Sequence, residues 1–144
     1  MRDIEELARL AIDAGFHIHK ALGPGLLESV YEALLALELT RAGLSIERQA
    51  PVRIEYEGVV LAEGFRADLL VENTLIIEIK SVDQLSPLHG KQLLTYLRLL
   101  QQPLGLLMNF GGATFREGVK RVVNNHAKPS QQLRVNRIPI IEIE

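Results

Sequence analysis

Two carboxylates and a lysine interrupt an otherwise apolar stretch in the middle of this 144-residue chain. Asp68 lies in the first of two short runs rich in Leu, Ile and Val, and Glu78 and Lys80 lie in the second. Both runs have the composition of strands, and the three polar residues 72–74 between them are typical of a hairpin turn. A three-residue turn would place Asp68 directly opposite Glu78, with their Cβ atoms about 4.5–5.5 Å apart.

Facing carboxylates repel each other and destabilise a sheet unless a cation lies between them. A divalent metal is the natural candidate, because Mg²⁺ can be held by two carboxylates while it keeps several waters. A metal there could activate a water against a phosphodiester. Lys80 points the same way as Glu78 and could orient that water or stabilise developing negative charge. This pattern therefore indicates phosphodiester hydrolysis.

A surface ion pair between Glu78 and Lys80 on a solvated strand is the simpler alternative. Leu70 and Ile76 would share their face of the hairpin, which favours a partly covered site instead. The opposite face is predicted to be an apolar core face. Its members are Ala67, Leu69, Val71, Leu75, Ile77 and Ile79.

Hydrophobic periodicity predicts helices at about 3–22, 26–41 and 87–100. Strands are predicted at 52–56, 65–71, 75–80, 104–110 and 114–123, with a further short strand before 65–71 and an edge strand at 138–143. This order predicts an α/β fold with a mixed sheet and helices on its faces. The strand at 104–110 should run parallel to 75–80 through a right-handed crossover.

Composition limits the class of protein. Hydrophobic residues make up 47% of the sequence and charged residues 24%, as in ordinary globular domains. The chain has no cysteine, which excludes disulfides and thiolate metal sites. No run of about 20 apolar residues could span a bilayer, and the N-terminus lacks a signal-peptide pattern. We expect one domain over residues 1–144, in the cytoplasm and without a membrane partner.

Charge is divided unevenly along the chain. Residues 1–80 carry eight basic and fourteen acidic side chains, whereas residues 81–144 carry eight basic and four acidic ones. A basic half of this kind could follow a phosphate backbone, although a solvated surface with accidental asymmetry explains it equally well. Its cations are Lys91, Arg98, Arg116, Lys120, Arg121, Lys128, Arg134 and Arg137.

The spacing of Asp68 and Glu78-Ile79-Lys80 resembles the PD-(D/E)XK nuclease signature, with Ala67 where many members have proline. Residues 22–31 read LGPGLLESVY and are similar to the Gly-x-x-Glu-x-x-Tyr motif of the GxxExxY family, a branch of that superfamily. The resemblance covers roughly residues 16–123, with 124–144 as a C-terminal tail. We expect Tyr31 of this motif to pack in the core with its hydroxyl hydrogen-bonded.

The resemblance implies a restriction-endonuclease-like core, with a mixed central sheet flanked by helices, and a metal-dependent nuclease. Mg²⁺, with Mn²⁺ as a substitute, would be bound by Asp68, Glu78 and Glu28, the last from the first core helix. Lys80 would assist the attacking water. Without the resemblance, Glu28 is an ordinary glutamate favoured by a helix dipole.

Gln92 and Tyr96 share a helix face and are similar to a Gln-x-x-x-Tyr motif of RecB-type nucleases, which implies that they support the lysine and contact nucleic acid. His89 would join that face, which otherwise is simply a polar helix face. Arg66 could contact a phosphate or pair with a neighbouring acid, and Lys91 is a further candidate for nucleic-acid binding.

The resemblance implies a nucleic-acid partner, with DNA expected rather than RNA. A chain this small has little surface with which to enclose DNA, so a homodimer is plausible. An alternative of a different class stays open: a non-catalytic nucleic-acid-binding or protein-interaction module that keeps the nuclease fold.

Overall fold

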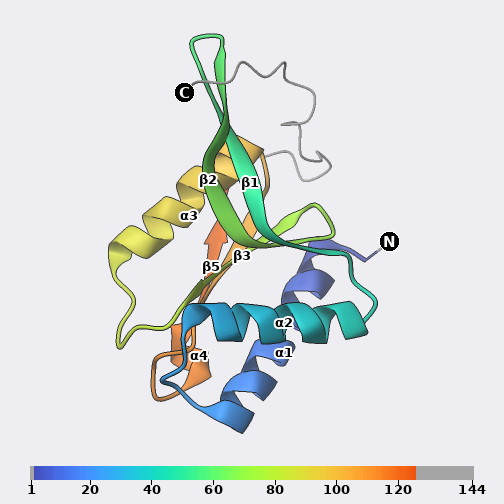
Figure 1. Ribbon diagram of the computed structural model, residues 1–144, viewed down its shortest axis with the longest axis vertical. Coiled ribbons are helices and arrows are strands. Elements are labelled where there is room, and N and C mark those ends of the chain that lie inside the picture. Colours follow the sequence, from blue (N-terminus) through green and yellow to red (C-terminus); the bar gives the residue numbers. More distant parts are fainter. Residues whose placement is uncertain (1, 126–144) are drawn as a thin grey trace.

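The computed structural model describes residues 2–125, except for the side chain of Glu63. Along the chain the elements are α1 (Ile4–Leu22), α2 (Glu28–Arg41), β1 (Ile46–Tyr56), β2 (Val59–Val71), β3 (Leu75–Lys80), α3 (Pro87–Leu100), β4 (Leu104–Asn109), α4 (Phe115–Gly118) and β5 (Val119–Val123). The five strands form one sheet in the order β1-β2-β3-β4-β5 (Figure 1). β3 and β4 are parallel and the other neighbours are antiparallel. The predicted α/β class, mixed sheet and parallel crossover are confirmed.

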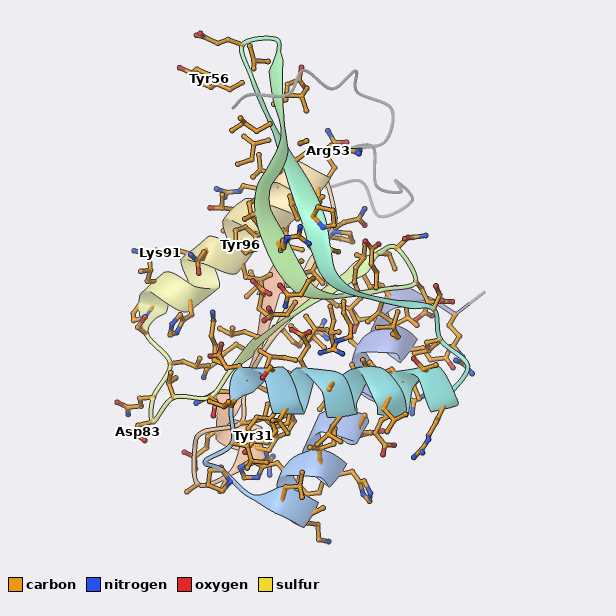
Figure 2. The ribbon with its side chains drawn as sticks, viewed as in Figure 1. Tyr31, Arg53, Tyr56, Asp83, Lys91 and Tyr96 are labelled. Atoms are coloured by element: carbon orange, nitrogen blue, oxygen red, sulfur yellow. The ribbon has the colours of Figure 1, made fainter. Side chains whose placement is uncertain are left out.

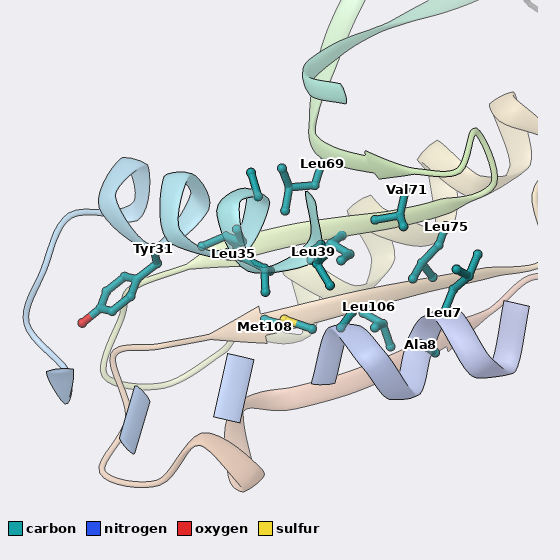
Figure 3. Close-up of a cluster of buried hydrophobic side chains, with 14 of the residues drawn as sticks. Leu7, Ala8, Tyr31, Leu35, Leu39, Leu69, Val71, Leu75, Leu106 and Met108 are labelled. Atoms are coloured by element: carbon teal, nitrogen blue, oxygen red, sulfur yellow. The ribbon is translucent and has the colours of Figure 1, made fainter. Parts of the chain in front are cut away.

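Helices cover both faces of the sheet. The larger apolar cluster joins α1 and α2 to one face, and Figure 3 shows side chains such as Leu7, Leu35 and Leu106 meeting there. A second cluster joins α3 to the other face through Leu93 and Leu97. Of the helices within residues 2–125, none combines the length and the apolar character needed to cross a membrane.

β1 and β2 form a long hairpin that extends away from the rest of the sheet (Figure 1). The separate short strand expected before residue 65 is wrong, because β2 is continuous from Val59 to Val71. Glu57 and Gly58, with φ of 50° and 80°, make the tight turn at the tip. Two positive φ angles in a two-residue loop match the twist of the flanking strands, which lets both strands run on.

The predicted strand at 114–123 is partly wrong, because its first half is the single helical turn α4. The Thr114 hydroxyl accepts a hydrogen bond from the N–H of Glu117, which caps this turn at its N-terminus. Phe115 is buried and its ring lies 5.1 Å from that of Phe110. The cap from Thr114 and the burial of Phe115 therefore favour a helical turn before β5. The edge strand expected at 138–143 lies outside the described residues.

Ala67 does not belong to the apolar face on which it was predicted. It packs in the cluster beneath α3, whereas Leu69 packs in the cluster beneath α1 and α2. The hairpin curves at this point, opposite Gln49, whose backbone has a φ of 51°. Strict alternation of faces holds only for a strand without such a bend, which explains the error.

Tyr31 is fully buried and holds the loop before α2 in position. Its ring stacks on Phe110 with centroids 4.4 Å apart. Its hydroxyl donates to the carbonyl of Gly23 at 2.6 Å and accepts from the N–H of Leu26 at 3.2 Å. The expectation of core packing with a satisfied hydroxyl is confirmed. This contact fixes the glycine-rich loop that leads into Glu28.

Replacing Tyr31 with phenylalanine should therefore destabilise the protein without emptying the core. Two partly buried backbone groups lose their side-chain partner, which should lower the free energy of unfolding by about 0.5–1.5 kcal/mol. Urea denaturation measures the change, and Tyr56→Phe at the exposed hairpin tip is the matched control. Equal stability of the Tyr31→Phe protein and the wild type would contradict this role of the hydroxyl.

Candidate active site

The hairpin of β2 and β3 has the predicted register. Val71 pairs with Leu75, and the pairing continues to Leu69 and Ile77. The N–H of Thr74 donates to the carbonyl of Val71 at 3.0 Å and closes the three-residue turn. Asp68 and Glu78 are the next residues along the two antiparallel strands.

At this position each carboxylate accepts a hydrogen bond from a main-chain N–H of the opposite strand. The N–H of Asp68 donates to Oε2 of Glu78 at 2.9 Å, and the N–H of Ile79 donates to Oδ2 of Asp68 at 2.7 Å. Each side chain therefore satisfies a main-chain donor of the opposite strand. The expected juxtaposition of Asp68 and Glu78 is present, and it lies where the regular pairing of β2 with β3 ends.

Glu78 is electrostatically unusual. Only 7% of the residue is exposed. Burial and, second, the charge of Asp68 raise the pKa of Glu78 from 4.5 to about 8, although the N–H of Asp68 and the charge of Lys80 oppose the shift. Both causes favour the protonated form of Glu78 in the metal-free site. A carboxyl held in this state beside another carboxylate is typical of a functional site.

The donor set fits a hard divalent cation. Two adjacent carboxylates offer only oxygen, and a bound cation would remove the repulsion that raises the Glu78 pKa. In the described part of the chain, no group of three or more His, Asp or Glu side chains is arranged to hold a metal ion. A pair of carboxylates suits Mg²⁺, which keeps several waters, better than Ca²⁺, which takes six to eight oxygen ligands.

Glu28 does not form a three-carboxylate cluster with Asp68 and Glu78. Its Oε2 accepts from the N–H of Ser81, the residue after Lys80, at 3.2 Å. The Ser81 hydroxyl in turn donates to the carbonyl of Leu26 at 2.7 Å. These bonds attach the start of α2 to the end of β3.

Tyr96 of α3 faces the carboxylates from the neighbouring layer. Burial and then the charges of Glu78 and Asp68 raise the pKa of the Tyr96 hydroxyl. Its ring stacks on Phe65 of β2, with centroids 3.6 Å apart and 19° between the planes. Gln92 lies one turn earlier on α3 and is exposed. The sequence did not single out Phe65, which looked like an ordinary strand residue.

The remaining candidates lie around this centre. Arg66 is exposed and its Nη1 donates to the carbonyl of Gln49 at 3.1 Å. Lys91 is exposed and extends outward from α3 (Figure 2). His89 has a local role: its Nδ1 accepts from the N–H of Ser86 at 3.1 Å and caps α3.

Two further residues near Asp68 were missed by the sequence analysis. Gln49 donates through Nε2 to Oδ1 of Asp68 at 3.2 Å and to Oε1 of Glu32 at 2.6 Å. Neither residue stands out in the sequence, because Gln49 precedes Asp68 by a whole hairpin and Glu32 is one of several acids on α2. The β1–β2 hairpin brings Gln49 to Asp68, and the packing of α2 brings Glu32 to Gln49.

Within the described residues, the cations of the basic half do not form one surface. Lys91 and Arg98 belong to α3, on one face of the sheet. Arg121 of β5 pairs with Glu5 of α1 at 2.9 Å, and α1 covers the other face. Lys128, Arg134 and Arg137 lie outside the described residues. Of the described cations of this half, Lys91 and Arg98 lie on the same helix as Tyr96, which faces the carboxylates.

A comparison with models of known protein families shows to which family the chain belongs. The model of the PD-(D/E)XK nuclease superfamily matches residues 5–122, most of the chain. The protein belongs to the PD-(D/E)XK nuclease superfamily. Asp68, Glu78 and α3 all lie within the matched segment. The observed α/β fold is consistent with this superfamily. No curated protein and no solved structure matches the chain significantly.

The Glu78 pKa of this PD-(D/E)XK protein predicts a pH-dependent stability. A carboxyl whose pKa is higher in the folded than in the unfolded state stabilises the fold while it stays protonated, and that advantage is lost as pH rises. Between about pH 4.5 and 8, metal-free wild type should lose stability relative to Glu78→Gln, at roughly 1.4 kcal/mol per pH unit as an upper limit.

Urea denaturation in the presence of a chelator measures this difference at several pH values. Above about pH 8 the difference should become constant, because Glu78 is then ionised in both states. Glu72→Gln, at the exposed turn of the same hairpin, is the control. Parallel stability curves for wild type and Glu78→Gln would show that the Glu78 pKa is not raised.

Proposed function

We propose that the protein is a metal-dependent nuclease that hydrolyses phosphodiester bonds of DNA rather than RNA, with Mg²⁺ as its ion and Mn²⁺ as a substitute. The observation that carries this proposal is the bonded pair of Asp68 and Glu78 with its raised Glu78 pKa. The superfamily supports nucleic acid as the substrate. The LGPGLLESVY segment at 22–31 supports assignment to the GxxExxY branch.

In this proposal Asp68 and Glu78 hold the ion. Bound there, Mg²⁺ would lower the pKa of a coordinated water and offset negative charge on the phosphate. Glu78 must lose its proton when it binds a cation, so binding is favoured as pH approaches 8. Asp68 keeps its orientation through the N–H of Ile79.

Lys80 supplies the positive charge of the mechanism. It follows Glu78 by two residues and its charge acts on that carboxyl. An ammonium group at this position can orient the attacking water and stabilise the charge that develops on the phosphate. No step then requires a covalent intermediate on the protein.

In our proposal five further residues support this centre: Glu28, Gln92, Tyr96, Lys91 and Arg66. Glu28 would reach the ion through a coordinated water, because its carboxylate is bonded to Ser81. Tyr96 is close enough to the carboxylates for their charges to raise the pKa of its hydroxyl. Gln92 and Lys91 on α3, with Arg66 on β2, would contact the nucleic-acid backbone.

Cleavage of labelled single-stranded, duplex and branched DNA and of RNA, with Mg²⁺ or Mn²⁺, tests the proposal. Asp68→Asn should lose metal binding and cleavage together, because a charged ligand is removed. Lys80→Ala should still bind metal but cleave about 10²-fold more slowly, the scale for one lost transition-state donor. Lys20→Ala, at the exposed end of α1, is the control.

Wild-type cleavage by a folded Lys80→Ala protein would refute the proposed mechanism. Tight nucleic-acid binding with no cleavage under any metal condition would instead favour the non-catalytic module. Calorimetry with Mg²⁺ separates the two further, since a binding module should show no metal uptake that depends on Asp68.

The cations of α3 should contribute to affinity for nucleic acid. Lys91→Ala combined with Arg98→Ala should weaken binding and reduce the slope of log affinity against log salt by up to about 1.8, since each phosphate contact contributes about 0.9. Fluorescence anisotropy between about 50 and 200 mM salt measures this slope. Arg9→Ala with Lys20→Ala on α1 controls for net charge. An unchanged slope would exclude α3 from the interface.

A further inference from the structure

Glu32 is a buried acid on α2 that the proposed mechanism does not use. The residue is 6% exposed. Its Oε2 accepts from Nε of Arg48 at 3.0 Å, and its Oε1 accepts from Nε2 of Gln49 at 2.6 Å. A buried carboxylate with a cationic partner and a second donor is held in one orientation, because leaving either oxygen unbonded is costly.

Gln49 links this fixed acid to the candidate active site. Its backbone is left-handed, with φ of 51°, at the bend of β1. The same Nε2 that donates to Glu32 also donates to Oδ1 of Asp68 at 3.2 Å. An amide nitrogen carries two hydrogens, and here each meets a carboxylate. The two acids therefore also determine which end of the Gln49 amide faces them.

Asp68 is consequently held at both oxygens. Oδ1 accepts from Gln49 and Oδ2 accepts from the N–H of Ile79 at 2.7 Å. Rotation of the carboxylate would break both bonds. Each oxygen still has a second lone pair with which to bind a cation.

We infer that Gln49 is a positioning residue for Asp68 and that Glu32 positions Gln49. The side-chain donor to Asp68 is the neutral amide of Gln49, whereas the cation Arg48 bonds to Glu32. A neutral donor orients the carboxylate without neutralising the charge that attracts a metal. Outer groups that orient a ligand in this way commonly contribute 10–100-fold to metal affinity. This inference rests on the proposed metal site.

Gln49→Met tests the inference, because methionine keeps the length of the side chain and removes both N–H groups. Calorimetric titration with Mn²⁺ at pH 8 should show affinity about tenfold weaker than in the wild type. Cleavage should fall in kcat by a similar factor at an unchanged KM for nucleic acid. Gln101→Met is the matched control, since Gln101 is also an exposed glutamine with a left-handed backbone, φ 55°, but belongs to the end of α3.

A second measurement needs no metal. In nuclear magnetic resonance spectra of the metal-free protein, the Gln49 side-chain amide hydrogens should be shifted downfield and exchange slowly. Asp68→Ala should move one of them and Glu32→Gln the other. Gln49 amide signals that ignore both substitutions would overturn the inference. If Gln49→Met does not fold, Glu32→Asp takes its place, because shortening this acid withdraws the partner that orients Gln49.

The outcomes separate this inference from the proposed function. Wild-type Mn²⁺ affinity in Gln49→Met, with binding lost in Asp68→Asn, overturns the positioning role and leaves the metal site intact. Absence of Mn²⁺ binding by the wild type overturns the proposed function, and the amide signals then decide alone whether Gln49 orients Asp68.

Discussion

The enforced proximity of two like-charged groups, Asp68 and Glu78, is the constraint on which the rest of this site depends. The fold brings them together because the β2–β3 register requires it, and the apolar residues of both strands fix that register. The cross-strand bonds to main-chain N–H groups offset part of the cost. The remaining repulsion contributes to the raised pKa of Glu78, which a bound cation would lower.

Three separate elements converge on this pair. α3 brings Tyr96, stacked on Phe65, against one side of the carboxylates. The start of α2 is fastened to the end of β3 through Glu28 and Ser81. The bend of β1 brings Gln49 to Asp68. Each contact joins segments that belong to different layers or strands, so the sheet and its helices together define the site.

The sequence predicted those features that depend on local pattern. The composition of residues 72–74 predicted the three-residue turn. That turn then predicted the pairing of Val71 with Leu75 and the juxtaposition of Asp68 with Glu78. The parallel β3–β4 pair followed from the intervening helix. Ala67 and Gln49 escaped prediction because a left-handed residue bends the hairpin, and nothing in the residue type of Gln49 signals a positive φ. Glu32 escaped because its partners come from another element.

The contacts around Asp68 also bear on how the protein reaches its folded state. Gln49 is separated from Glu32 by 17 residues and from Asp68 by 19, and Ser81 from Glu28 by 53. Non-local contacts form only after long loops have closed, which makes them slow. The local hairpins can form first, whereas the contacts around Asp68 and Glu28 are completed only when α2, β1 and β3 have docked. The arrangement of Asp68, Glu78, Gln49 and Glu28 is therefore a property of the finished domain, because segments far apart in the sequence must dock before it exists.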